Sequence, residues 1–160
     1  MKKSQINTLL ISTILISQLF FFSLAFAGTT VIETLSFGTV AVLDNSSTSE
    51  VTVTSTNTVS CTNHIRILIP GHRAEFLLTS YPTYTTVFTT VNILSAETTS
   101  PATASEQFTL INLEIAPSVT TDGTGFASVY VGGTLRTSGS GSGQYFDSSY
   151  TATYELNLNF

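Results

Sequence analysis

Cys61, His64 and His72 are the side chains whose types and spacing come nearest to a metal site. A structural zinc site needs about four ligands whose side chains converge on one point. The chain has one cysteine, and Cys61 and His64 stand three positions apart, so they would point to opposite faces of a straight strand. We therefore interpret both histidines as surface or turn residues, and we expect neither a metal ion nor another cofactor.

Three other patterns could carry chemistry, and each has a simpler interpretation. Glu97 and Glu106 flank a polar segment and could form an acid–base pair for glycoside hydrolysis, but carboxylates also keep a loop soluble. Ser, His and Asp are present without the Gly-x-Ser-x-Gly turn that presents a nucleophile. Residues 139–143 are glycine-rich, but no helix or lysine follows, which indicates a hairpin turn and not a phosphate loop. We expect no enzyme.

Cys61 is the only cysteine in the sequence, so no disulfide can form within the chain. In an oxidising compartment a lone cysteine is either buried or free to bridge to another chain. The segment Val59-Ser60-Cys61-Thr62 has the composition of a strand, which favours a buried small side chain over an intermolecular bridge.

The first 27 residues have the organisation of an export signal. Lys2 and Lys3 give a positive start, residues 9–24 are mostly apolar, and Ala25-Phe26-Ala27 fits a cleavage site. A membrane anchor is the alternative, but the apolar run is interrupted by polar residues and is short against the roughly 20 residues of a span. We expect a mature chain from Gly28 that is exported through the periplasm to the outer surface or the medium.

Charge excludes one class of partner. The chain has ten carboxylates, five basic side chains and a net charge of −5 at pH 7. Two of the basic residues are Lys2 and Lys3, so the exported part is more acidic still. Nucleic acid binding requires a basic surface, so we expect no nucleic-acid partner. We also expect no membrane span in the mature chain.

Alternation of apolar and polar residues, broken by turn residues, runs through 28–160, and no stretch there has the 3.6-residue apolar spacing of an amphipathic helix. Short turn-bounded segments of this kind predict an all-β fold, with one antiparallel sandwich domain over 28–160. A barrel is less favoured because the strands differ in length. About eight strands are expected, at 29–42, 51–59, 65–69, 74–79, 84–94, 108–115, 126–135 and 150–160.

Local signals give finer expectations. Gly38 suggests a bulge or bend in the first segment. Pro70-Gly71 predicts a tight turn that closes a hairpin, and residues 95–105 have the composition of a polar loop. The strand at 108–115 has two faces, and the better candidate for the core face carries Thr109, Ile111, Leu113 and Ile115.

The last eleven residues alternate strictly between apolar and polar side chains. This pattern predicts a strand with one buried face that continues to the final residue. Our candidate interaction residues are the apolar positions of that strand, Tyr150, Tyr154, Leu156, Leu158 and Phe160. The alternative that each of them only fills the core stays open.

Tyr145 and Phe146 are a second candidate interaction site because they follow the glycine-rich turn. Two adjacent aromatic rings beside a turn could form a platform for a ligand, although packing within a hairpin is the more common role of such residues.

Several segments occur in a fixed order: Leu35-Ser36-Phe37-Gly38-Thr39-Val40, Arg73-Ala74-Glu75-Phe76, Val131-Gly132-Gly133-Thr134-Leu135, Gly143-Gln144-Tyr145 and the final Tyr/Thr strand. Together they resemble domain of unknown function 4402, a secreted bacterial family grouped with pilin-like and adhesin-like sandwiches such as spore coat protein U-like proteins and archaic chaperone–usher subunits. The resemblance covers the whole of 28–160. It implies an immunoglobulin-like sandwich that acts as a structural subunit or adhesin at the cell surface.

The resemblance also implies a mode of assembly. In related pilins a periplasmic chaperone holds an incomplete sandwich, and the next subunit completes it with an N-terminal strand. The implied partners are other subunits of a surface fibre and a chaperone–usher pair. Only seven residues, 28–34, precede Leu35 here, and Glu33 interrupts their apolar pattern, so a self-complete fold and a terminal subunit stay open. The alternative function is a monomeric module that binds carbohydrate or protein.

Overall fold

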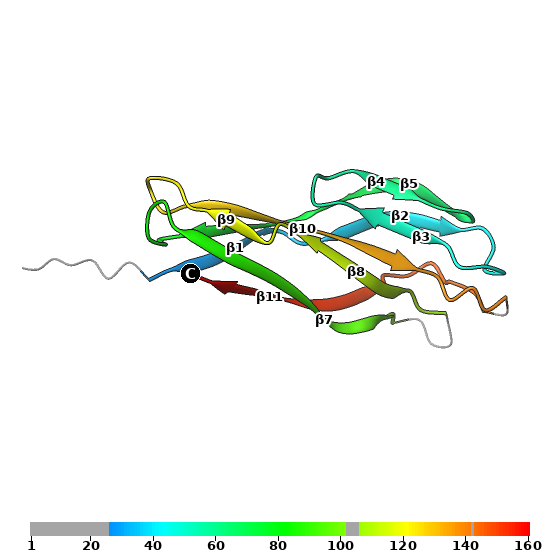
Figure 1. The fold of residues 1–160 in the computed structure, drawn as a ribbon. Coiled ribbons are helices and arrows are strands. Elements are labelled where there is room, and N and C mark those ends of the chain that lie inside the picture. Colours follow the sequence, from blue (N-terminus) through cyan, green and yellow to red (C-terminus); the bar gives the residue numbers. More distant parts are fainter. Residues whose placement is uncertain (1–25, 102–105, 142) are drawn as a thin grey trace, which may run out of the picture.

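The computed structural model describes residues 26–101, 106–141 and 143–160, so the predicted export signal lies outside it except for Phe26 and Ala27. The described residues form eleven strands and no helix (Figure 1). The all-β fold is therefore confirmed, with more strands than the sequence predicts. The segments at 29–42 and 51–59 each contain two strands, and a further short strand follows Pro117.

These strands are rich in Thr, Val, Ile, Phe and Tyr, which pack well on a pleated surface. In chain order they are β1 (Gly28–Glu33), β2 (Ser36–Val42), β3 (Glu50–Val53), β4 (Val59–Cys61), β5 (Ile65–His72), β6 (Ala74–Thr79), β7 (Thr86–Thr99), β8 (Thr109–Ile115), β9 (Ser118–Thr120), β10 (Ala127–Arg136) and β11 (Thr151–Asn159).

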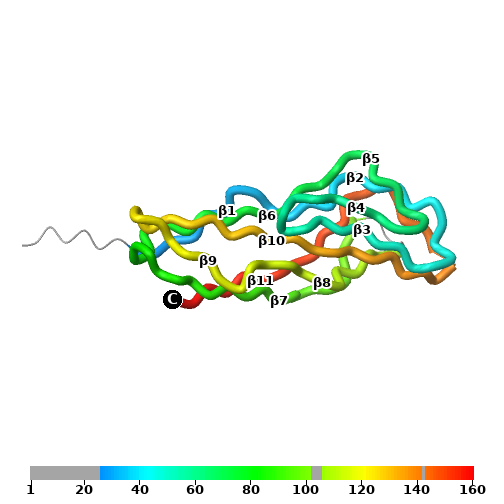
Figure 2. Tube along the Cα trace, turned by 45° about the horizontal axis from the view of Figure 1, so that its top comes forward, coloured from blue at the N-terminus to red at the C-terminus, as the bar shows by residue number. Residues whose placement is uncertain are grey.

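The strands have the order of an immunoglobulin-like sandwich. One layer runs β1-β6-β10-β8, which is the A-B-E-D sheet when the strands are lettered along the chain. The other layer contains β7 and β11, which correspond to C and F. The bridge between Glu97 and Thr109 pairs β7 with β8, so the two layers are continuous there in one nine-stranded sheet that runs β1-β6-β10-β8-β7-β11. In Figure 2, β7 and β11 run along one side of the molecule, with β1, β6 and β10 along the other.

The remaining strands extend this frame. β2 and β5 form a separate two-stranded ribbon, and β9 pairs with the start of β7. β3 pairs with the second half of β10, from Gly133 to Arg136, beyond the part of β10 that pairs with β6. β4 then pairs with β3. All of these pairings are antiparallel.

Two buried clusters fill the interior. Each fully buried aliphatic side chain contributes about 1.5–3 kcal/mol of hydrophobic stabilisation. Cluster I consists of Val51, Ile65, Phe108, Leu110 and Leu135. Cluster II consists of Leu78, Tyr81, Val87 and Val129. Side chains of β11 pack against both clusters, so the last strand crosses the whole length of the core.

The predicted turn at Pro70-Gly71 is wrong. Both residues lie inside β5, which pairs with β2 and not with β6. A proline is tolerated there because β5 has a partner on one side only, so its missing N–H need not break a ladder. Gly38, where a bulge or bend is predicted, has a φ of 77° but is in register with Pro70. The β2–β5 register shifts between Thr39 and Val40, where Leu68 of β5 is the extra residue, so the bulge lies on the facing strand.

The core face predicted for 108–115 is only partly right. Leu113 and Ile115 pack against the clusters, but the buried residues at the start of β8 are Phe108 and Leu110. The reason is a register shift against β10, where Asn112 pairs with Thr134 and Leu110 with Leu135, so Ile111 is the extra residue of a bulge. The loop predicted at 95–105 is also too long, since β7 continues to Thr99.

Candidate functional site

β11 is the clearest candidate for a functional surface because it is a long strand with one unpaired edge. Among the described residues it pairs with β7 and with no other strand. The pairing is irregular at Thr151–Thr153 and then uninterrupted from Tyr154 to Asn159, which face Ile93 to Phe88. The N–H and C=O groups that point away from β7 over these six positions lie on the open edge.

The two faces of β11 differ as the alternation predicts. Leu156 and Leu158 point inward, pack against cluster II and are half-buried. Phe160 lies beyond the strand and is 64% exposed, while its ring meets the buried Tyr81 edge-on at a centroid distance of 4.8 Å. The inward side chains of β11 therefore pack against the core, and part of their surface stays accessible to solvent.

The candidate residues Tyr145 and Tyr150 lie at the other end of the sandwich. Their rings surround Phe108, with centroids 4.4 Å and 5.0 Å from it. The Tyr145 hydroxyl donates to the Gln107 carbonyl at 3.2 Å and accepts from the Ser138 N–H at 2.9 Å. Phe146 is 46% exposed. The structure thus places Tyr145 in packing contacts and leaves Phe146 as the exposed ring of that pair.

Tyr154 lies between these two groups, where β1 passes into β2. Burial raises the pKa of the Tyr154 hydroxyl above its ordinary value of 10.0, and a hydrogen bond from the Leu35 backbone lowers it in part. The Leu35 side chain in turn approaches Gly133 of β10, where an added Cβ would lie 3.1 Å from Leu35 Cδ2. Three of the segments that carry the family resemblance therefore meet at one point of the core.

The half-buried Tyr145 and Tyr154 predict a loss of stability in alkali. Burial is also the main cause that raises the pKa of Tyr145. As the pH rises, the unfolded chain loses the hydroxyl protons of Tyr145 and Tyr154 before the folded chain does. The stability that these two hydroxyls contribute is therefore fully present below pH 10 and is lost as the pH rises through their raised pKa in the folded state. We expect urea midpoints to fall between about pH 9 and about pH 11, and to fall less in a Tyr145→Phe/Tyr154→Phe double variant. An equal fall in both proteins would contradict this assignment.

The residues considered for chemistry are not brought together. The Cys61 thiol packs half-buried against cluster I and donates to the Ile65 carbonyl at 3.3 Å. His72 lies 3.6 Å from the Glu33 carboxylate. Within the described ranges no group of three or more His, Cys, Asp or Glu side chains could hold a metal ion.

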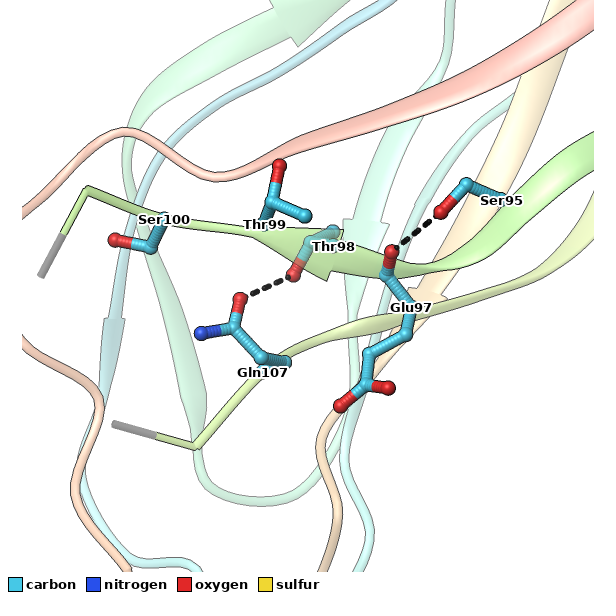
Figure 3. A pocket seen from close by; sticks show the side chains of 6 residues that line it. All are labelled: Ser95, Glu97, Thr98, Thr99, Ser100 and Gln107. Carbon is cyan, nitrogen blue, oxygen red and sulfur yellow. Dashed lines mark hydrogen bonds between the residues drawn. The ribbon is translucent and has the colours of Figure 1, made fainter. Parts of the chain in front are cut away.

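A shallow, open depression lies beside the hairpin between β7 and β8 (Figure 3). It has a volume of about 380 Å³ and is lined by Ser95, Glu97, Thr98, Thr99, Ser100 and Gln107. Glu97 is its one carboxylate; Glu106 does not line it. Hydrogen bonds from Ser140 and Ser138 lower the pKa of Glu106, whereas a general acid needs a raised pKa. Glu97 and Glu106 therefore do not line this depression together, and the direction of the Glu106 shift is opposite to that of a general acid.

Sequence reasoning missed β1 as a second exposed edge. β1 is the end strand of its layer, and five of its six residues are exposed. Val31 and Ile32 are 54% and 52% exposed although both are apolar. The available signal was the pair of adjacent apolar residues followed directly by Glu33, which does not fit a strand with one buried face.

No helix among the described residues is both long enough and apolar enough to cross a membrane. Neither the curated proteins nor the solved structures gave a match to this chain. Its sequence does match one protein family, described as Domain of unknown function (DUF4402), over residues 28–160. That range covers all eleven strands and both clusters, and the chain therefore belongs to the DUF4402 family.

Proposed function

We propose that this protein is an exported bacterial surface subunit, structural or adhesive in a pilus-like fibre, that assembles by strand complementation at the open edge of β11. The observation that supports this most strongly is the strand order. An immunoglobulin-like domain has an A-B-E-D sheet and a C-F-G sheet, and this chain supplies A, B, E and D as β1, β6, β10 and β8. It supplies C and F as β7 and β11, and the described residues contain no strand in the G position beside β11.

The physical chemistry of that edge favours strand addition. Natural proteins protect exposed edges with lysine, proline, bulges or covering loops. From Tyr154 to Asn159 the strand is regular, has no proline or lysine, and carries Glu155 as its one charged residue. An added strand would gain main-chain hydrogen bonds along this edge and would cover what remains accessible of the half-buried Leu156 and Leu158.

The test is the state of the protein at the cell surface. We expect the surface fraction to contain heat-sensitive oligomers that resist SDS, because a strand held in a β-ladder dissociates slowly. The control is Cys61→Ser, which removes the one cysteine and must leave the oligomers unchanged if no intermolecular disulfide holds them. Recovery of the protein only as a free monomer, from both the surface and the purified fractions, would contradict the proposal.

The alternative, a monomeric module for carbohydrate or protein, is favoured by the exposed ring of Phe146 beside the glycine-rich turn. A glycan screen of the purified monomer tests it. Phe146→Ala should abolish any binding without unfolding the chain, whereas Tyr145→Ala would also disturb the packing around Phe108.

A further inference from the structure

We infer that the outward face of β7, β9 and β11 binds a neutral oligosaccharide, with one sugar ring stacked on Phe88 and the sugar hydroxyls bonded to the asparagine side chains beside it. Side chains stand roughly perpendicular to a sheet, whereas the unpaired N–H and C=O groups of β11 point along it. This face is therefore separate from the open edge of β11, and the inference goes beyond the proposed function.

The strand register sets Phe88 among polar side chains. Its neighbours Val87 and Thr89 are buried, so Phe88 points outward, where it is 60% exposed. It pairs with Ser118 of β9 on one side and with Asn159 of β11 on the other. Directly opposed side chains have Cβ atoms about 4.5–5.5 Å apart. The open phenyl ring thus has a hydroxyl close to one side of it and a carboxamide close to the other.

The polar surface continues along the two longer strands. The next outward pairs are Thr90 with Asn157 and Asn92 with Glu155. From Phe88 to Asn92 the face extends by about 14 Å, since each residue of an antiparallel strand adds about 3.4 Å. This surface is longer than one sugar ring and therefore suits a short chain of sugars.

The asparagine side chains of this face have no partner in the described part of the chain. Asparagine is depleted in strands, yet Asn92 lies in β7 and Asn157 and Asn159 lie in β11. None of the three side chains makes a hydrogen bond to a described residue. By contrast, hydrogen bonds to the chain hold the side chains of the asparagines in the connecting segments, Asn45, Asn57 and Asn63. The three strand carboxamides are therefore available to a ligand.

A neutral sugar matches the chemistry of these groups. A carboxamide offers two donors and one acceptor, and a hydroxyl both donates and accepts. The C–H groups of a sugar ring form an apolar face that can cover a phenyl ring. Glu155 is the one charged residue among the outward side chains from Phe88 to Asn92 and their partners, so no cation lies there to pair with a sulfate or carboxylate. A sugar of negative charge would therefore bind more weakly than its neutral counterpart.

The test measures binding of the purified chain to immobilised oligosaccharides of glucose, galactose and mannose, each beside a sulfated or sialylated counterpart. We expect the neutral sugars to bind more tightly than the charged ones. Phe88→Leu keeps an apolar side chain but loses the flat ring, so it should lower the affinity by about tenfold, whereas Phe88→Tyr should stay within about twofold. Asn157→Asp exchanges donors for a carboxylate and should also lower the affinity by about tenfold.

Leu94 and Asn112 provide matched controls. Leu94 is 65% exposed on the same strand as Phe88, but it is the extra residue of a bulge against β11 and so lies outside the regular part of the face. Asn112 is an exposed asparagine of β8, in the other layer. Leu94→Ala and Asn112→Asp should each change the affinity by less than about twofold, as should Phe146→Ala at the other end of the sandwich. Circular dichroism and urea midpoints check that every variant is folded.

The outcomes separate this inference from the proposed function. Failure of every sugar to bind, or equal binding by Phe88→Leu and the unchanged chain, would overturn the inference and leave assembly at the β11 edge standing. Loss of binding in Phe146→Ala alone would overturn it in favour of the glycine-rich turn. Self-association that Phe88→Leu abolishes, with no sugar bound, would overturn it in favour of a contact between copies. A chain that binds sugar through Phe88 but is monomeric in every fraction would support the inference and contradict the proposed function.

Discussion

Replacing Gly38 by alanine should cost roughly 2–5 kcal/mol of unfolding free energy, the largest effect we expect from any single methyl group in this protein. The backbone at Gly38 has a φ of 77°, and a Cβ there would lie 2.0 Å from the Ile69 carbonyl oxygen. Gly71 on the facing strand is equally crowded, since its Cβ would lie 2.0 Å from the Ser36 oxygen. The β2–β5 ribbon must therefore separate or shift to accept either side chain. Urea unfolding of the purified chain measures the loss.

Gly141 supplies the control because it has nearly the same backbone conformation without the crowding. Its φ is 71°, and the nearest atom to an added Cβ is the Ser46 Cα at 4.0 Å. Gly141→Ala should therefore cost only the conformational strain, about 1–2 kcal/mol. If the two variants lost the same free energy, the close contact between β2 and β5 would not be part of the folded state.

Removal of residues 157–160 should destabilise the chain by roughly 3–6 kcal/mol, a large share of the 5–15 kcal/mol that holds a typical domain. The deletion removes the pairing of Asn157, Leu158 and Asn159 with β7. It also removes the Leu158 contact with cluster II and the Phe160 ring from Tyr81. We expect low abundance in the exported fraction and a lower urea midpoint for any protein recovered.

The control for that deletion is Asn159→Thr, which changes an exposed side chain and keeps the whole strand. It should shift the unfolding free energy by less than about 0.5 kcal/mol. A truncated chain with an unchanged midpoint would show that the last four residues act only in contacts with other chains and not in the fold.

The last strand illustrates what the sequence can predict. Its apolar positions alternate without error from Tyr150 to Phe160, and period 2 depends only on local geometry. The same rule failed in β8, where a bulge at Ile111 moves the buried face from Leu110 to Leu113. That bulge arises from pairing with β10, which is distant in sequence. Pro70-Gly71 was misread for a similar reason, because only the position of β5 at the margin of a ribbon makes a proline acceptable within a strand.

The candidate site was predicted in part. Of the residues expected on the inward face of the last strand, Tyr150, Leu156 and Leu158 pack against the clusters, whereas Phe160 is 64% exposed. Their role in interaction stays a prediction.

The adjacent apolar residues Val31 and Ile32 followed by Glu33 indicate locally that β1 has no single buried face, but its place at the end of the opposite layer depends on which strands lie beside it. The same limit applies to Leu35, Gly133 and Tyr154, which come from three distant segments and meet only in the folded chain.

Amide hydrogen exchange along Tyr154 to Asn159 tests the open edge most directly. In an antiparallel pair every second N–H points to the neighbouring strand, so in the purified monomer alternate amides of this segment should be protected by β7 and the others should exchange quickly. In the surface-assembled form all of them should exchange slowly, because an added strand would bind the second set. Protection of both sets in the monomer, or continued fast exchange of the second set after assembly, would contradict the account.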